Sequence, residues 1–212
     1  MGEGKSLLAK MVIENMEHEC SLEGCKAMVA HGEYKRHQEA CRFRLVICPG
    51  NKRTCNKMIA FCEVEEHVKT CKTISTSMES EEGSGIFALR FNLPEAKLND
   101  LGFVSWGCQM LKSNDLNTCF MNMNKHNNII SMEVVMVGSE EDCMQHKVEI
   151  SVQSPETEEV IFKSMFSPRP ISATNKEEMC LTVKQTSLAK FWQYNKDLKG
   201  YNFAISVQIH TI

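Results

Sequence analysis

A two-residue alternation of apolar and polar side chains marks the second half of the chain. Residues 146–153 (HKVEISVQ) follow it, and residues 202–209 (NFAISVQI) repeat it near the end. Alternation of this kind places one face of a strand in the core and the other in solvent. Further strands are expected at four short apolar runs between polar or proline-containing turns, namely 85–91, 129–137, 159–165 and 179–183. Several short strands with one helical stretch, around 187–192, predict an all-β antiparallel sandwich.

The first half has a different pattern. Residues 5–17 place Leu8, Met11, Val12 and Met16 at helical spacing, which predicts a short amphipathic helix. The cysteine-rich stretch that follows has few apolar runs, so it cannot bury enough surface to fold unaided. A stretch rich in Ser, Thr, Glu and Gly then has the composition of a linker. The predicted units are a helix or connector at 1–17, a cysteine-rich unit at 18–72, a linker at 73–84 and a β-sandwich at 85–212.

Cysteine usage indicates metal binding rather than disulfides. Seven of the eleven Cys lie between Cys20 and Cys71, and the N-terminus lacks the apolar region and cleavage site of a secretory signal. In a reducing compartment, clustered Cys with interleaved His bind metal more often than they form disulfides. The net charge of -3 argues against a chain built mainly to neutralise nucleic-acid phosphates. No run of apolar residues approaches the length of a membrane span.

Two sets of four residues have the spacing of metal ligands. In both sets the last three members follow the same pattern, C-x11-H-x3-C, and only the gap before them differs. The first set is Cys20, Cys25, His37 and Cys41, and the second set is Cys48, Cys55, His67 and Cys71.

Tetrahedral zinc explains this spacing. Two Cys come from a turn or hairpin, and a His and a Cys at i and i+4 of a helix point toward the same ion. Three thiolates and one imidazole leave no open position, so such a site is structural rather than catalytic. Structural zinc contributes on the order of 10–16 kcal/mol of apparent binding free energy, which is enough to decide whether a small module folds. Residues 18–72 are therefore predicted to be a double zinc finger that holds two structural Zn²⁺ ions.

Other chemistry-bearing residues are expected to have ordinary roles. Cys62 competes with Cys48 as a ligand, but using it would abandon the repeat, so a free or buried thiol is expected. His18 and His31 are expected on the surface, because neither has the required spacing. The remaining expectations are a buried thiol at Cys143, a surface His at His146, core or core-edge aromatics at Trp106 and Trp192, and no catalytic residues.

The ligand order, the connector CRFRLVICPG (41–50) and the β-rich remainder resemble the seven-in-absentia (Siah/Sina) family of E3 ubiquitin ligases. The resemblance covers roughly residues 6–212, and SPRPI (167–171) and FAISVQIHTI (203–212) add to it. It implies two SIAH-type zinc fingers, with the ligand sets above, packed on a TRAF-like antiparallel sandwich that binds substrates and forms homodimers. It also implies that substrate peptides are recruited along a sheet edge by strand addition.

The chain departs from the family pattern in several places. Its first Cys pair is separated by four residues where six is typical, and its last ligand is Cys71 where His is common. The strand before SPRPI lacks the Trp that relatives place near their peptide groove, so substrate preference is not carried over. A RING, the domain that docks the ubiquitin-conjugating enzyme, has no counterpart, since the sequence holds no C-x2-C pair. We expect either a fragment of a longer protein or a gene without the RING segment.

The expected function is that of a zinc-binding substrate-recognition and dimerisation module of a Siah-type E3 ligase. Such a module recruits target proteins for ubiquitination and proteasomal degradation and is inactive alone. The alternative is a RING-less, TRAF-like adaptor that competes for the same partners, and nucleic-acid binding is a weaker third hypothesis. Expected partners are proteins with short peptide motifs, a second copy of the chain, and a ubiquitin-conjugating enzyme only where a RING is supplied. The expected location is the cytoplasm, with the nucleus as an additional compartment.

Overall fold

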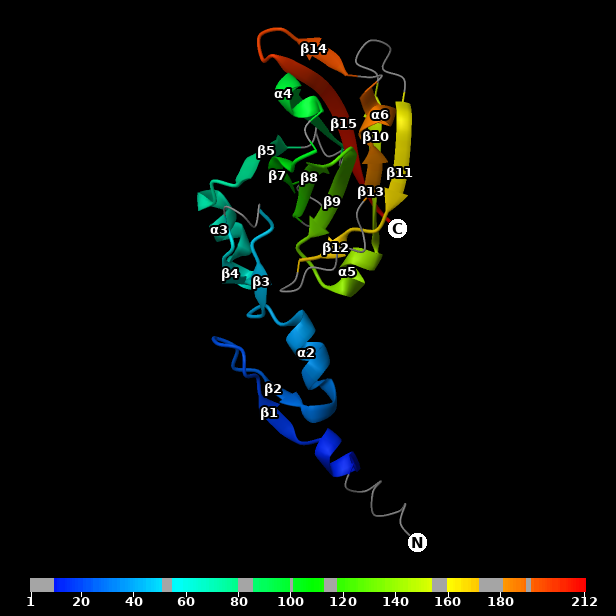
Figure 1. Cartoon of the computed structure of the whole chain (residues 1–212). Coiled ribbons are helices and arrows are strands. Elements are labelled where there is room, and N and C mark those ends of the chain that lie inside the picture. Colours follow the sequence, from blue (N-terminus) through cyan, green and yellow to red (C-terminus); the bar gives the residue numbers. More distant parts are fainter. Residues whose placement is uncertain are drawn as a thin grey trace.

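The computed structural model describes residues 10–50, 55–79, 86–99, 101–112, 118–153, 160–171, 181–189 and 192–212. Two small cysteine-rich units come first, and a larger β domain follows (Figure 1). Among the described residues, no helix is both long and apolar enough to cross a membrane. The β-rich fold with antiparallel sheets that the two-residue alternation predicts is confirmed.

The two small units repeat one arrangement, which is a short hairpin, a 3-10 turn and a helix. The first finger, residues 17–41, contains β1 (Glu17–Glu19), β2 (Met28–Ala30), η1 (His31–Glu33) and α2 (Tyr34–Ala40). The second finger, residues 45–71, contains β3 (Leu45–Ile47), β4 (Met58–Ala60), η2 (Phe61–Glu63) and α3 (Val64–Thr70). Both hairpins are antiparallel. Figure 1 shows the first finger extending away from the β domain and the second finger lying beside it.

In the part of the β domain that the structure describes, the strands form a five-stranded and a six-stranded sheet. The five-stranded sheet contains β6 (Ile86–Pro94), β10 (His146–Gln153), β11 (Val160–Phe166), β14 (Gln193–Asn195) and β15 (Gly200–Thr211). The six-stranded sheet contains β5 (Ile74–Glu79), β7 (Val104–Lys112), β8 (Cys119–His126), β9 (Ile129–Met136), β12 (Arg169–Pro170) and β13 (Leu181–Lys184). Within the described residues of this domain, three short helices connect strands, namely α4 (Glu95–Leu98), α5 (Glu140–Met144) and α6 (Gln185–Leu188).

The two sheets share one hydrophobic core. Side chains such as Leu89 and Ile205 of the five-stranded sheet cluster with Met121 and Val134 of the six-stranded sheet. Trp106 and Trp192 pack against the edge of this cluster, as expected for core-edge aromatics. Because alternate residues of each strand face inward, the period of two seen in the sequence follows directly from this shared core.

Part of the outer face of the six-stranded sheet is buried as well, because the second finger covers it. A second cluster joins Val46, Val64 and Val68 of the finger with Phe120 of β8 and Val135 of β9. Phe120 lies directly opposite Val135 in the β8–β9 register. The finger and the sheet therefore fold against one another as a unit, and burial of these side chains gives the finger a core that it lacks by itself.

Three sequence expectations differ from the structure. Residues 74–79, expected to be part of a linker, form β5, which pairs in parallel with β7. Ile74 is buried against the second finger, and this packing outweighs the polar composition around it. A helix was expected at 5–17, and residues 10–14 are helical. Glu17 belongs instead to β1. Residues 5–9 lie outside the described part of the chain. The helix expected around 187–192 is α6, which ends at Leu188.

Candidate metal centres

The first cluster lies where the β1–β2 hairpin meets the end of α2. Cys20 and Cys25 come from the turn of the hairpin, whose shape is fixed by backbone bonds from Cys20 N to the Ala27 carbonyl at 2.9 Å and from Cys25 N to the Leu22 carbonyl at 3.0 Å. His37 lies in α2, and its Nε2 is 3.5 Å from Cys25 Sγ. The four ligand atoms of Cys20, Cys25, His37 and Cys41 all lie within 4.8 Å of one another.

The second cluster repeats this geometry on β3, β4 and α3. Cys48 follows β3, and its Sγ lies 3.2 Å from His67 Nε2 and 3.7 Å from Cys71 Sγ. Cys55 Sγ is 3.6 Å from the same His67 nitrogen. The ligand atoms of these four residues also lie within 4.8 Å of one another. The eight residues that the spacing identifies are thus brought together as two Cys3His clusters, each of which could hold one metal ion.

The helices end at the clusters instead of running through them. Cys41 and Cys71 are the C-cap residues of α2 and α3 and have extended backbone conformations. A His and a Cys were expected on one face of each helix. His37 and His67 do lie within their helices, whereas Cys41 and Cys71 each lie one residue beyond the helix end. An extended residue at this point turns the chain toward the next strand and still directs its thiol to the cluster.

Several groups outside the two sets hold the thiols, and the sequence pattern does not identify them. The amide of Phe43 donates to Cys41 Sγ at 3.5 Å, and the amide of Gly50 donates to Cys48 Sγ at 3.4 Å. The hydroxyl of Thr73 lies 3.1 Å from Cys71 Sγ. Each of these groups is two residues after its Cys, and amide donors at that spacing stabilise the negative charge of a thiolate. This shared offset of two residues becomes apparent only when the thiols are placed beside these groups.

Thiol acidity differs between and within the clusters. The backbone amide of Ala27 lowers the pKa of Cys25, a partly buried thiol, to about 7. Burial raises the pKa of Cys48 to about 12 and also raises the pKa of Cys41. Burial acts in the same direction on Cys71, but bonds from Thr73 outweigh it and lower its pKa. Burial also lowers the pKa of His67, which favours the neutral imidazole that a metal requires.

Metal affinity at the second cluster is expected to fall as the pH falls. A metal ion binds the thiolate, so it must displace the proton of every Cys that is protonated at the working pH. Cys48, with a pKa of about 12, carries its proton throughout the neutral range. Affinity should therefore drop at least about tenfold for each pH unit of acidification. Chelator competition across the neutral pH range measures this slope, and an affinity that does not change with pH would contradict it.

Replacing Gly50 with alanine is expected to weaken the second cluster selectively. A Cβ at this position would lie 2.1 Å from the Thr73 hydroxyl oxygen. The added methyl group must displace Thr73, which contacts Cys71, or move the Gly50 amide that donates to Cys48. Loss of such outer-shell partners lowers metal affinity by about 10–100-fold. Chelator competition should show this loss at one of two sites, and Gly32→Ala, whose Cβ meets nothing closer than 3.6 Å, is the matched control.

The other candidate donors lie outside both clusters. Cys62 is exposed, in agreement with the expectation of a free thiol. His18 packs edge-on against His31, with ring centroids 5.3 Å apart, and neither belongs to a Cys3His cluster. The expectation of a surface His at His146 is wrong, since its side chain is buried with Nδ1 2.7 Å from the Asp142 carbonyl oxygen. His146 begins β10 directly after α5, and this bond closes the end of the helix.

Comparisons with known proteins do not assign a family. No family model matches the chain, and no curated protein matches it.

Proposed function

We infer that this chain is the zinc-dependent substrate-recognition and dimerisation module of a Siah-type E3 ubiquitin ligase. The observation that carries the inference is the pairing of two tandem Cys3His clusters with a two-sheet β domain on which the second finger packs. This order of parts resembles SIAH-type fingers followed by a TRAF-like sandwich. The module brings target proteins to a ubiquitin-transfer machinery, which leads to their proteasomal degradation.

Zinc is the metal that these ligands favour. Three thiolates and one imidazole in a closed arrangement suit tetrahedral Zn²⁺, whereas Ca²⁺ and Mg²⁺ require oxygen ligands. Cys48 and Cys71 are buried, with relative exposures of 2% and 9%, so water has little access to an ion held there. Each ion acts as a cross-link between a hairpin and a helix, and its role is structural.

Peptide recruitment is assigned to the free edge of the five-stranded sheet. Among the described strands, β11 ends the sheet and pairs only with β10. Its side chains Val160 and Met165 are 52% and 54% exposed. A strand edge with exposed apolar side chains is a template for an added strand, in which backbone bonds give affinity and side-chain contacts give selectivity.

A peptide array probed with the full chain tests this assignment. Selected extended peptides should bind the parent chain, and Met165→Asp should weaken them at least about tenfold, the loss typical of a central contact residue. Met144→Asp is the matched control, because Met144 is also exposed but lies on α5. Equal binding by both variants would contradict a site at β11.

Sedimentation equilibrium of the same preparations measures the proposed homodimer.

Ubiquitin transfer is expected only when a RING is supplied. The purified chain with activating enzyme, conjugating enzyme and ubiquitin should form no ubiquitin chains. Fusion to a RING domain should allow modification of a protein that carries an array-selected peptide. Ubiquitin chains made by the unfused polypeptide would show that it is catalytic by itself and would overturn the assignment as a recognition module.

A RING-less adaptor that competes for the same partners is the second candidate. The 212 residues hold no C-x2-C pair, which is compatible with either candidate. The two candidates differ in whether a RING domain acts together with the module in the cell. A RING encoded in frame upstream of Met1, or a RING protein that co-purifies with the natural protein, supports the ligase. Natural protein that binds the selected peptides without any ligase activity supports the adaptor.

A further inference from the structure

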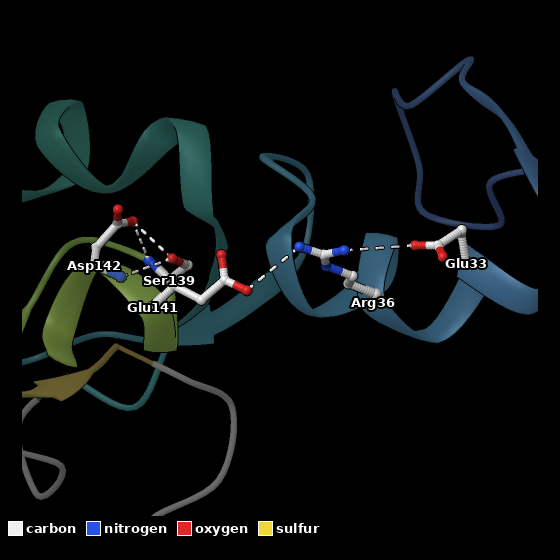
Figure 2. A network of polar contacts seen from close by, with 5 residues as sticks. All are labelled: Glu33, Arg36, Ser139, Glu141 and Asp142. Atoms are coloured by element: carbon white, nitrogen blue, oxygen red, sulfur yellow. Dashed lines mark hydrogen bonds and ion pairs between the residues drawn. The ribbon is translucent and has the colours of Figure 1, made fainter. Parts of the chain in front are cut away.

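The two fingers meet the β domain in different ways. The first finger does so through exposed polar groups, because Arg36 of α2 donates from Nη2 to Glu141 Oε1 of α5 at 3.4 Å (Figure 2). Neither hydrophobic cluster of the described residues contains a residue of the first finger. The second finger instead buries Val64 and Val68 of α3 against β8 and β9. A junction with buried apolar walls can receive an apolar side chain, whereas an exposed ion pair offers no such surface.

A cavity of about 250 Å³ lies at the junction of the second finger and the six-stranded sheet. Its buried lining residues are Val68 of α3, Phe120 of β8 and Thr118, which are 2%, 0% and 6% exposed. Met110 of β7 is half-buried and adds to the apolar lining. Small-molecule pockets usually measure about 300–1,000 Å³, so this smaller volume suits one large side chain of a peptide.

Charged side chains line the same cavity. Glu65 and Lys69 come from α3, and Lys112 comes from β7. Lys69 already donates to Glu66 at 2.7 Å. Lys112 Nζ lies 3.8 Å from Glu65 Oε1, beyond hydrogen-bond distance, and both side chains are more than half exposed. Because such an ion pair contributes little and an ammonium group has three donors, Lys112 can bind a carboxylate that a ligand supplies.

We propose that this cavity binds an acidic peptide segment of a partner protein. One Leu, Met or Phe side chain of the peptide enters the cavity and leaves water against Val68 and Phe120, and a neighbouring carboxylate binds Lys112. The lining holds two ammonium groups and one carboxylate, so an acidic segment is favoured over a basic one.

This site is separate from the β11 edge. Phe120 belongs to the cluster on the outer face of the six-stranded sheet, whereas β11 lies at an edge of the five-stranded sheet. The core that the two sheets share lies between them. The inference therefore does not depend on the peptide site proposed at β11.

The cavity requires the second metal cluster, because one of its walls belongs to the finger. Val68 follows His67 in α3, and His67 Nε2 lies 3.2 Å from Cys48 Sγ. Loss of the metal ion should release α3 and remove this wall, while Lys112 stays on the sheet. Peptide binding at this site should therefore be lost when a chelator removes the metal, and binding that survives this treatment would overturn the proposal.

A defined set of peptides tests the ligand class with the zinc-loaded full chain. Each peptide holds one Leu, Met or Phe and two Glu at varied distances from it, and its counterpart has Lys in place of both Glu. Fluorescence anisotropy should show binding of some acidic peptides, with their basic counterparts bound at least about tenfold more weakly. The proposal is overturned when no acidic peptide binds more tightly than its counterpart.

Three substitutions test the role of Lys112. Lys112→Glu should weaken a selected acidic peptide about tenfold and strengthen its basic counterpart. Glu65→Gln removes the competing carboxylate and should strengthen the acidic peptide about two- to threefold. Lys35→Glu is the matched control, since this side chain is 90% exposed on α2 of the first finger. Equal affinities of Lys112→Glu and Lys35→Glu for the acidic peptide would overturn the proposal.

Amide ¹H–¹⁵N spectra locate the bound peptide. Residues 64–70, 110–112 and 118–120 should shift during the titration, and Met165→Asp at β11 should bind the peptide as the parent chain does. Shifts confined to β11 would assign the peptide to that edge, which would overturn this inference and leave the proposed function intact. Shifts of residues 64–70 when the chain is concentrated without peptide would identify a second copy as the occupant and would also overturn it.

Discussion

Cys48→Ser is expected to unfold the second finger and to reduce the metal content from two ions to one. Cys48 Sγ lies 3.2 Å from His67 Nε2 and 3.7 Å from Cys71 Sγ, so its loss removes a ligand that contacts two others. Structural zinc contributes on the order of 10–16 kcal/mol of apparent binding free energy, more than the usual stability of a whole domain. No packing within so small a unit can offset a loss of this size.

The effect should extend beyond the finger. Cys48 belongs to the same hydrophobic cluster as Phe120 and Val135, which the finger covers on the six-stranded sheet. When the finger unfolds, these side chains become exposed, and binding of a hydrophobic dye should increase. Amide exchange over residues 45–71 should accelerate to the rate of an unfolded chain, while the first finger keeps its metal.

Cys62→Ser is the matched control for this substitution. Cys62 is in the same finger, but it is exposed and lies outside both clusters. The Cys62→Ser variant should keep two metal ions and the amide-exchange pattern of the parent chain. If Cys48→Ser behaved like Cys62→Ser in both measurements, Cys48 would not be a ligand, and the second cluster would require a different fourth donor.

Arg44→Ala is also expected to produce a large loss of stability, although Arg44 is not a ligand. Its guanidinium group donates from Nη1 to the Cys41 carbonyl and from Nη2 to the Gly138 carbonyl, both at 3.1 Å. The same group lies 3.7 Å from the ring centroid of Phe61 in the second finger. Arg44 thus connects both fingers and the β domain, and burial lowers its pKa from the usual Arg value.

The size of this effect follows from the three contacts. A hydrogen bond to a charged group contributes about 1.5–3 kcal/mol, and a cation over an aromatic ring contributes about 0.5–2 kcal/mol. Because Arg44 is only half-buried and such contributions do not add fully, we expect a total loss of about 2–4 kcal/mol. For a chain of this length, that loss lowers the melting temperature by roughly 5–10 °C. Calorimetry in excess zinc measures it.

Arg44→Lys tests whether the planar guanidinium group is required at this position or whether a positive charge is sufficient. Lysine keeps the positive charge but cannot donate in a fork to two separate carbonyls while stacking on Phe61. It should recover less than half of the loss seen with alanine. Full recovery would mean that charge alone is required at this position, and no loss in Arg44→Ala would mean that the three contacts do not hold the fingers in place.

The metal clusters could be predicted from the sequence because ligand chemistry imposes local spacing. The C-x11-H-x3-C pattern repeats in both fingers, and the chain between the ligands is too short to place them in many ways. The groups that support the thiols carry no such spacing signal. Thr73 and Gly50 have no distinctive chemistry in a sequence, and their roles appear only when Cys71 and Cys48 are placed beside them.

The strands that were not predicted are those whose pattern depends on distant parts of the chain. In β8, Phe120 faces the second finger and Met121 faces the shared core, so adjacent residues are both buried. This breaks the alternation of apolar and polar residues, because the sheet is covered on both faces. β5 was expected to be a linker for a related reason, since its pairing with β7 depends on a register that local composition does not specify.

Determination of bound metal before and after treatment with a chelator tests the central claim most directly. The claim is that each Cys3His cluster holds one structural ion, and that these ions keep the first third of the chain folded. Elemental analysis of reduced, purified protein should find two zinc ions per chain. After removal of the metal, circular dichroism and amide exchange should show that residues 17–71 are unfolded. A metal-free chain in which both fingers remain folded would contradict the claim.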